Sequence, residues 1–153
     1  MRPDPVRRDP AIYPFTIEIT TRFGDMDINH HINNVAYARY FEEARVKFNH
    51  NGILLGDGHR LPDIVPYRTI VAAVSISYLL EGAYGPSMLV GVGISRIGKA
   101  SFDMAAACFQ EGRCLAVSDA VIALKAADGR GMPDSLRDRL TARALTIGLK
   151  PAG

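Results

Sequence analysis

The chain is most constrained by an abrupt change of pattern within residues 22–45. The first part, RFGDMDINHHINN, gathers two Asp, three Asn and two His. The second part has apolar residues at the helical spacing i, i+4, i+7 and i+11, namely Tyr37, Phe41, Ala44 and Phe48. Asn33 is a good N-cap and Asn51-Gly52 a good stop, so we expect a helix from Asn34 to about His50. Polar groups crowded before a helix are typical of a site at the helix N-terminus, where unpaired backbone N–H groups attract developing negative charge.

Alternating apolar and polar residues predict strands on both sides of this helix. One strand is expected before it, at residues 15–22, and four after it, at residues 69–80, 87–96, 100–110 and 113–125. Gly98-Lys99 and Glu111-Gly112 suit tight turns between the later strands, residues 53–68 have the composition of a loop, and residues 134–145 have helical spacing. One strand, one long helix and then four strands connected by hairpins is an α+β order. We therefore expect a curved antiparallel sheet packed on the long helix.

The composition is that of ordinary globular protein. A chain of 153 residues with 48% hydrophobic residues suits one domain, and a net charge of +2 gives no support for nucleic-acid binding. The N-terminal MRPDPVRRDP lacks the apolar segment of a secretory signal, and the longest apolar run, residues 70–80, is too short to cross a membrane. We expect a cytoplasmic protein with a flexible N-terminal arm at residues 1–13, a domain at residues 14–130, and a C-terminal helix and tail at residues 131–153.

The two cysteines do not make a disulfide framework. With Glu111-Gly112 as a two-residue turn, Phe109 faces Cys114 and Cys108 faces Leu115. The two thiols then project from opposite faces of the hairpin, and we expect both to be free.

The motif in residues 25–45 carries a specific resemblance. The pattern D-x-D-x-N-x-H-I-N-N followed by Y-x-x-Y-F-E-x-A-R resembles the acyl-CoA thioesterases of the hotdog fold, the 4-hydroxybenzoyl-CoA thioesterase-like group. The resemblance extends over roughly residues 13–130, including RIGKASF at the middle hairpin. It implies a sheet wrapped around its central helix, hydrolysis of acyl-CoA or acyl-carrier-protein thioesters, and a site between the subunits of a homodimer or homotetramer. We expect no cofactor or metal, and no nucleic-acid or membrane partner.

Asp27 is the expected catalytic carboxylate, as general base or nucleophile. A thiolate leaves without much acid assistance because a thiol pKa is only about 8.5, so hydrolysis needs a carboxylate, a water and donors for the oxyanion. The chain has no G-x-S-x-G elbow, and neither cysteine is next to a histidine in sequence. In the resembling family the acting carboxylate is the second Asp of D-x-D, which is Asp27 here. The simpler alternative is that Asp27 only caps a turn, and Asp25 is expected to orient the loop.

Asn29 and His31 complete a D-x-N-x-H pattern that also resembles plant acyl-carrier-protein thioesterases of the same fold. The resemblance implies that His31 positions water or polarises the carbonyl and that Asn29 holds the thioester oxygen. The structural alternatives are a turn residue at Asn29 and a hydrogen bond from His31 to a backbone carbonyl. No Arg, Lys or Ser in the motif is placed to hold the oxyanion, so we expect the backbone N–H of Asn34 to do so.

Two further features concern the substrate. Arg96, Lys99 and Ser101, at the middle hairpin, are expected to meet the pantetheine or the phosphates of coenzyme A. His30 stands where the resembling family usually has Gly, and we expect its side chain to narrow the pocket or to change the loop conformation.

Three other functions compete with thioester hydrolysis. A hotdog hydratase or dehydratase uses an Asp/His pattern on the helix, and residues 34–49 contain neither residue type. A non-catalytic acyl-CoA-binding protein is the second alternative. A metal hydrolase would use Asp25, Asp27, His30 and His31, but adjacent residues on an extended segment point in opposite directions, so both histidines are not expected to reach one ion. The sequence leaves four questions open. These are the identity of the acyl chain, the choice between coenzyme A and carrier protein, the choice between nucleophilic and general-base attack, and the choice between dimer and tetramer.

Overall fold

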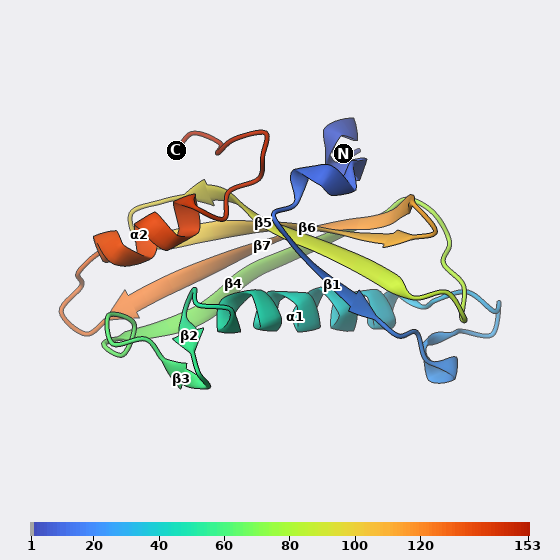
Figure 1. The fold of residues 1–153 in the computed structure, drawn as a ribbon, viewed down its shortest axis with the longest axis horizontal. Helices are drawn as coiled ribbons and strands as arrows, with labels where there is room; N and C mark the ends of the chain where they lie inside the picture. Colours follow the sequence, from blue (N-terminus) through green and yellow to red (C-terminus); the bar gives the residue numbers. More distant parts are fainter. Residues whose placement is uncertain (1) are drawn as a thin grey trace.

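The computed structural model describes residues 2–153, and its centre is one five-stranded antiparallel sheet (Figure 1). The strands lie in the order β1-β5-β6-β7-β4, and their bounds are β1 (Phe15–Ile19), β4 (Tyr67–Tyr78), β5 (Met88–Ile97), β6 (Ser101–Gln110) and β7 (Arg113–Ala126). Hairpins join β5 to β6 and β6 to β7, as predicted.

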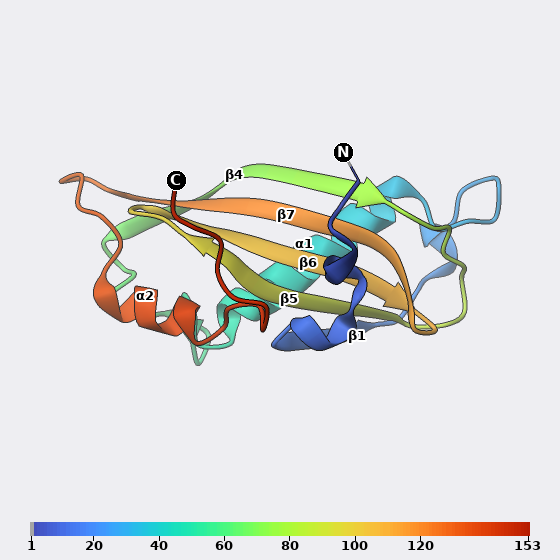
Figure 2. The ribbon, with the colours of Figure 1, turned by 90° about the horizontal axis from the view of Figure 1, so that it is seen from above.

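The connection between β4 and β5 is a crossover, and the hairpin we expected there is wrong. β4 pairs with β7 at one edge of the sheet, so residues 79–87 cross to β5 on the far side of β6 (Figure 2). Burial explains this order. β5 is buried along nearly all of its length, whereas most residues of β4 are exposed, and a strand covered on both faces belongs in the middle of a sheet.

Helix α1 (Asn34–His50) crosses one face of the sheet, as predicted. The Asn33 side-chain oxygen accepts a hydrogen bond from the Ala36 N–H at 2.8 Å, and Gly52 follows the helix with φ of 77°, so both predicted helix signals are present. The helix buries an apolar stripe against the sheet, formed by Ala36, Tyr37, Tyr40, Phe41, Ala44 and Phe48. An α+β fold with a curved antiparallel sheet and a central helix is therefore confirmed.

The N-terminal segment, for which a flexible arm at residues 1–13 was predicted, packs on the opposite face of the sheet in its described part. Two short 3-10 helices, η1 (Pro5–Arg8) and η2 (Pro10–Ile12), are each started by a proline and capped by the preceding aspartate. Prolines that suggested a loose arm instead preset these turns. Arg7 is only 6% exposed and donates to Asp119, 2.9 Å away, and to the Tyr13 hydroxyl, 3.2 Å away.

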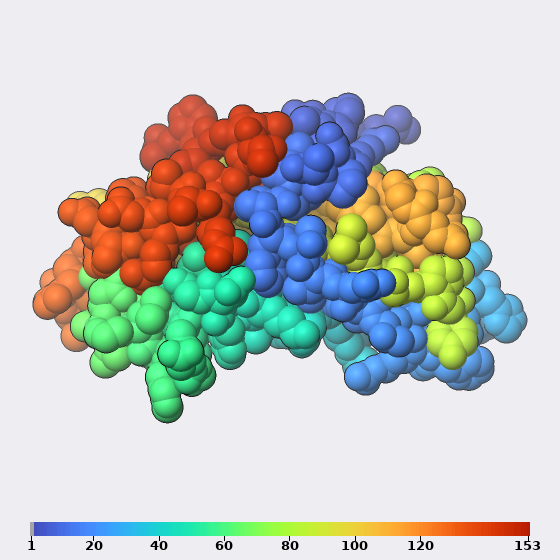
Figure 3. Space-filling model, viewed as in Figure 1, coloured from blue at the N-terminus to red at the C-terminus, as the bar shows by residue number. Residues whose placement is uncertain are grey.

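The C-terminal segment completes the covering of the sheet. Helix α2 (Asp134–Thr141) adds Leu136 and Leu140 to the main core. The tail then returns over the sheet beside the N-terminal segment, where the Thr146 N–H donates to the Ile12 oxygen at 3.0 Å (Figure 3). The division into a domain at residues 14–130 and a tail at residues 131–153 stays a prediction.

Smaller features complete the fold. Residues 53–68, expected as a loop, contain a short hairpin of β2 (Leu55–Gly56) and β3 (His59–Arg60).

No helix within residues 2–153 combines the length and the apolar character needed to cross a bilayer.

Both cysteines are free. Cys108 lies in the core under α1 and Cys114 in the core of the other face, as predicted. The predicted pairing of Cys108 with Leu115 is wrong, because a bulge shifts the register and places Ala116 opposite Cys108.

Candidate active site

The loop between β1 and α1 is closed by its own backbone. Met26 and Ile32 form an isolated antiparallel bridge. Inside this bridge, the Asp27 N–H donates a hydrogen bond to the His31 carbonyl oxygen at 2.9 Å. The Ile32 N–H donates to the Gly82 oxygen at 2.9 Å, which joins the loop to the crossover between β4 and β5. The loop is therefore held in place at one end of the sheet.

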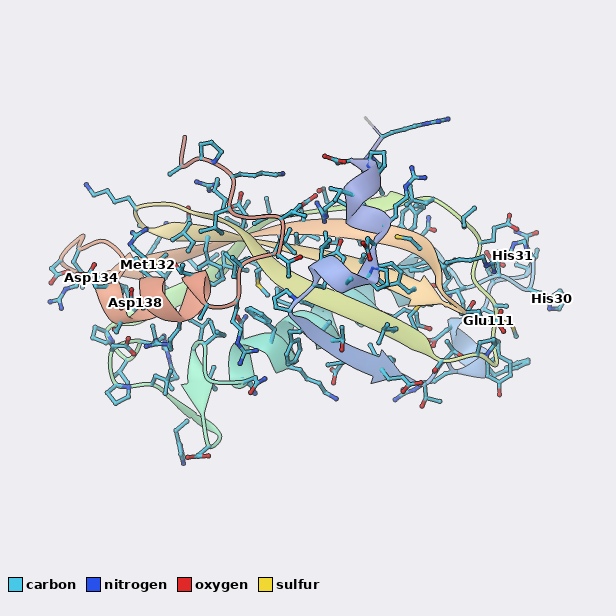
Figure 4. The ribbon with its side chains drawn as sticks, turned by 45° about the horizontal axis from the view of Figure 1, so that its top comes forward. His30, His31, Glu111, Met132, Asp134 and Asp138 are labelled. Atoms are coloured by element: carbon cyan, nitrogen blue, oxygen red, sulfur yellow. The ribbon has the colours of Figure 1, made fainter. Side chains whose placement is uncertain are left out.

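His30 lies at the tip of this loop with φ of 61°. Glycine adopts this left-handed conformation freely, whereas other residues lose about 1 kcal/mol or more. The His30 ring points away from the rest of the molecule and does not line the hollow described below (Figure 4). The narrowing of the pocket that we expected from His30 is therefore not found, and His30 takes the backbone conformation that a glycine would take.

The Asp27 carboxylate has one engaged and one free oxygen. Its Oδ1 accepts hydrogen bonds from the Asn29 N–H at 2.8 Å and from the His31 N–H at 3.3 Å. Its Oδ2 accepts none from residues 2–153, and the side chain is exposed. Asp27 thus caps the turn, as the simpler alternative held, and still presents an oxygen to solvent.

Asp25 is buried and fastens the loop to the helix. Its Oδ2 accepts hydrogen bonds from the Tyr40 hydroxyl at 2.6 Å and from the Arg22 N–H at 2.9 Å. Burial, reinforced by the hydrogen bond to Asp25, raises the pKa of Tyr40 well above its usual value, so this hydroxyl stays a donor. The Asn33 N–H donates to the Asp25 backbone oxygen at 2.8 Å, so Asp25 orients the loop as expected. Residues 2–153 contain no group of three or more His, Cys, Asp or Glu side chains placed to hold a metal ion.

His31 is half-exposed and faces Glu81. Its Nε2 lies 3.2 Å from the Glu81 carboxylate, which belongs to the crossover after β4. Glu81 was not predicted, because the crossover comes close to the loop only when β4 lies at the edge of the sheet beside β7. Figure 4 shows His31 at the end of the sheet opposite α2.

These residues share one open hollow of about 380 Å³. The structure brings together all four residues that we predicted to be catalytic. The loop and the start of α1 contribute Asp27, Asn29, His31, Ile32, Asn34 and Tyr37 to its lining, and the end of β4 with the crossover contributes Tyr78, Leu79, Leu80 and Glu81.

The helix N-terminus faces this hollow with a free donor. The Asn33 carbonyl and side chain accept from the N–H groups of Ala36 and Tyr37. The Asn34 N–H donates to no acceptor within the described chain, and Asn34 is exposed. This is the arrangement in which a helix start binds an anion.

Tyr37 was interpreted as core, and its ring is indeed buried, but its hydroxyl is unusual. The hydroxyl faces the Gly82 backbone and makes no hydrogen bond to any residue of 2–153. Burial, with smaller contributions from Cys108 and Tyr78, outweighs the opposing effect of the nearby Gly82 backbone and raises the pKa of Tyr37 to about 12, so the hydroxyl keeps its proton. Buried polar groups without a partner are rare, and the periodic spacing that identified Tyr37 as core gives no information about the hydroxyl.

Arg96, Lys99 and Ser101 lie away from this hollow within one chain. They belong to the β5–β6 hairpin, which lies near α2 at the other end of the sheet (Figures 1 and 4). The Arg96 guanidinium donates to both carboxylate oxygens of Asp103, at 2.8 and 2.9 Å. Their contact with coenzyme A stays a prediction.

Comparisons with known proteins agree with this architecture. A model of the thioesterase-like superfamily matches residues 21–141. A predicted thioesterase from Bacillus stearothermophilus has a similar structure, with 27% identity, a TM-score of 0.74, and coverage of 88% of this chain and 98% of that one. A thioesterase-superfamily protein from Jannaschia sp. CCS1 has 27% identity and a TM-score of 0.74, with coverage of 88% and 85%. A thioesterase from Thermus thermophilus, in complex with coenzyme A and Zn, has 26% identity and a TM-score of 0.70, with coverage of 86% and 94%.

A comparison with curated proteins found no match. The family model nevertheless spans most of the chain, and the fold has the helix and antiparallel sheet of the hotdog thioesterases. The chain therefore belongs to the thioesterase-like superfamily, whose shared chemistry is thioester hydrolysis.

Proposed function

We propose that this protein hydrolyses acyl thioesters of coenzyme A or acyl-carrier protein to a free acid and a thiol. The observation that carries the proposal is the grouping of the Asp27 carboxylate, Asn29, His31 and the free Asn34 N–H around one hollow. The similar thioesterase from Thermus thermophilus is in complex with coenzyme A, which supports a coenzyme A thioester as the substrate.

The proposed reaction uses Asp27 as its carboxylate. The free Oδ2 takes a proton from a water as the water oxygen bonds to the thioester carbonyl carbon. The carbonyl oxygen becomes an oxyanion, which the Asn34 N–H stabilises. The C–S bond then breaks, and the thiolate leaves with little acid assistance because its pKa is only about 8.5. Direct attack by Asp27 Oδ2, followed by hydrolysis of the anhydride, is the nucleophilic form of the same proposal.

His31 and Asn29 have supporting roles in this proposal. The Glu81 carboxylate 3.2 Å from Nε2 orients the His31 ring, so His31 can polarise the carbonyl or hold the water. Asn29 lies in the same hollow, where its side-chain amide is suited to hold the thioester oxygen.

The proposed assembly is a homodimer or a dimer of dimers. β4 is an edge strand of twelve residues that, within residues 2–153, pairs with β7 alone, so its other side has unpaired backbone groups. It also exposes Val71, Val74 and Tyr78, and Tyr78 lines the hollow. A second copy paired along β4 would cover this apolar edge and close the open side of the site. Light scattering that finds a monomer with full hydrolytic rate would refute this assembly.

Acyl-CoA binding without hydrolysis is the competing function. The hydrogen bonds that Asp27 Oδ1 accepts within the turn favour binding without hydrolysis, because an aspartate that caps a turn needs no catalytic role.

A thiol-release assay over a panel of acyl-CoAs and acyl-carrier proteins tests the proposal. The wild-type protein should release thiol and free acid from at least one substrate, with the acid identified by mass spectrometry. An Asp27→Asn variant purified in parallel controls for contaminating thioesterase. Tight acyl-CoA binding without release would support the competing function, and neither binding nor release would overturn both.

A further inference from the structure

A second hollow, of about 770 Å³, lies beside the candidate active site and is lined by three arginines. Arg2 and Arg8 come from the N-terminal segment and Arg113 from the start of β7. No aspartate or glutamate lines this hollow. None of the three guanidinium groups makes an ion pair or a side-chain hydrogen bond with the described residues. We call this feature the arginine hollow.

The arginine hollow borders the candidate active site at the end of β4. Tyr78, Leu79 and Leu80, at the end of β4, line both hollows. A ligand whose reacting end lies near Asp27 therefore reaches the arginines by passing over Leu79 and Leu80, which follow the β4 edge that a second copy would cover. A thioester of coenzyme A or of a carrier protein has this form, because a flexible pantetheine arm separates its thioester from its phosphate.

The N-terminal segment is anchored, so Arg8 has a defined position. Its neighbour Arg7 is buried and donates to the Ala106 and Ser118 carbonyl oxygens at 3.3 and 3.0 Å, as well as to Asp119. The 3-10 turn of η1 directs Arg8 to the other side, where it is exposed and lines the hollow. Because the segment is anchored, less of its conformational entropy is lost when a ligand binds to Arg8.

We propose that the arginine hollow binds the phosphate groups of the pantetheine carrier while the thioester lies at Asp27; this inference rests on the proposed function. Guanidinium groups match phosphate oxygens with paired, charge-assisted hydrogen bonds. Arginines without an intramolecular partner form such bonds without first losing an ion pair. Arg96, by contrast, already donates two hydrogen bonds to Asp103 and one to the Ser101 hydroxyl.

The test compares substrates that have the same acyl group but different phosphates. These are acyl-CoA, acyl-dephospho-CoA, acyl-carrier protein and acyl-pantetheine, which has no phosphate. In an Arg8→Gln/Arg113→Gln variant, the KM for acyl-CoA should rise at least about tenfold with kcat little changed, since one charge-assisted hydrogen bond is worth that much or more. The KM for acyl-pantetheine should stay the same. An increase for acyl-carrier protein that equals the one for acyl-CoA would identify the shared phosphate next to the pantetheine, and a larger increase for acyl-CoA would identify the nucleotide phosphates.

The matched control removes two charges from the far end of β4 and β7, away from the arginine hollow. Arg68 and Lys125 face each other on β4 and β7 and are exposed, so Arg68→Gln/Lys125→Gln should leave the KM values unchanged. An equal KM increase on acyl-pantetheine, or an increase only in an Arg96→Gln/Lys99→Gln variant, would overturn the proposal.

Binding of coenzyme A itself, measured by calorimetry, separates this inference from the proposed function. If the protein hydrolyses no substrate, the proposed function is wrong. Weaker binding of coenzyme A by the Arg8→Gln/Arg113→Gln variant than by the wild type would still support the phosphate site. If the variant and the wild type bind coenzyme A equally, the phosphate site is wrong whatever the protein hydrolyses.

Discussion

The two ends of the sheet use their polar side chains differently. Near the β5–β6 hairpin and α2, charged groups satisfy one another, since Arg96 pairs with Asp103 and Arg139 with Asp63. At the opposite end, several groups that could have been paired are left free. These are one oxygen of Asp27, the N–H of Asn34 and the hydroxyl of Tyr37. The Asn49 side-chain oxygen, in the last turn of α1, is also buried without a partner among the described residues. The distinguishing feature of the first end is therefore that several free groups lie together, since folded proteins satisfy most of their polar groups.

The largest expected effect is at Asp27, and Asp103, at the other end of the sheet, is the carboxylate for comparison. Asp27→Asn should lower thioester turnover at least about a hundredfold, the loss typical of a positioned acid–base group. Asp103→Asn breaks an ion pair and should lower stability with little effect on turnover of the folded protein. Steady-state kinetics with thermal melts of both variants makes the comparison. Near-normal turnover by a folded Asp27→Asn variant would remove Asp27 from the mechanism and end the contrast between the two ends.

The next effect tests the free donor of the helix. Asn34 is the first residue of α1, where proline is tolerated and its missing N–H costs no helix hydrogen bond. Asn34→Pro should lower kcat by about a hundredfold, the scale of losing one oxyanion donor, and Asn34→Ala much less. Equal losses in the two variants would point to the side chain or the loop. A fully active proline variant would show that the oxyanion is held elsewhere.

A smaller effect, on stability, concerns the unpaired Tyr37 hydroxyl. A Cβ at Gly82 would lie 2.6 Å from that hydroxyl and 2.9 Å from a Leu115 methyl, so Gly82→Ala should destabilise the fold by about 2 kcal/mol. In a Tyr37→Phe background the cost should fall, because the closest atom is gone. Urea unfolding of both single variants and the double variant gives the coupling. Purely additive free energies would show that the hydroxyl does not fill this space.

Local patterns were sufficient for α1, for the long strands and for four residues of the candidate site. The cap at Asn33, the apolar stripe and Gly52 determine both ends of α1, and the D-x-D-x-N-x-H motif contributes Asp27, Asn29 and His31 to one hollow. These features depend on neighbours within a few residues, which is the range over which periodicity and capping act.

The features that sequence reasoning missed depend on contacts between distant segments. The position of β4 beside β7 follows from burial of the other strands, and it brings Glu81 to His31. The packing of the N-terminal segment depends on Arg7 reaching Asp119, more than one hundred residues away in sequence. The ion pair of Arg96 with Asp103 was also missed. A two-residue turn at Gly98-Lys99 would place Arg96 opposite Ser101, whereas the observed loop is longer and pairs Arg96 with Asp103.

The smallest expected effect is at the satisfied end, where Asp63 fastens the loop after α1 to α2. Arg139 donates to its two carboxylate oxygens at 2.9 and 3.1 Å, and Ser135 also donates to it. Burial alone would raise the pKa of Asp63, but the hydrogen bonds from Arg139 and Ser135 and the charge of Arg139 outweigh it and lower the pKa below its usual 3.8. Because the folded-state pKa is the lower one, the stabilisation is complete above pH 3.8 and is lost as the pH falls from there through the folded-state value. Asp63→Asn should therefore lower the free energy of unfolding by about 1 kcal/mol at pH 7, and the difference from wild type should shrink below pH 3.8. Urea unfolding of both proteins at pH values from 7 down to 3 measures the difference. A difference that stays constant over this range would mean that the Asp63 side chain acts by its shape and neutral hydrogen bonds, and that charge pairing does not distinguish this end of the sheet from the other.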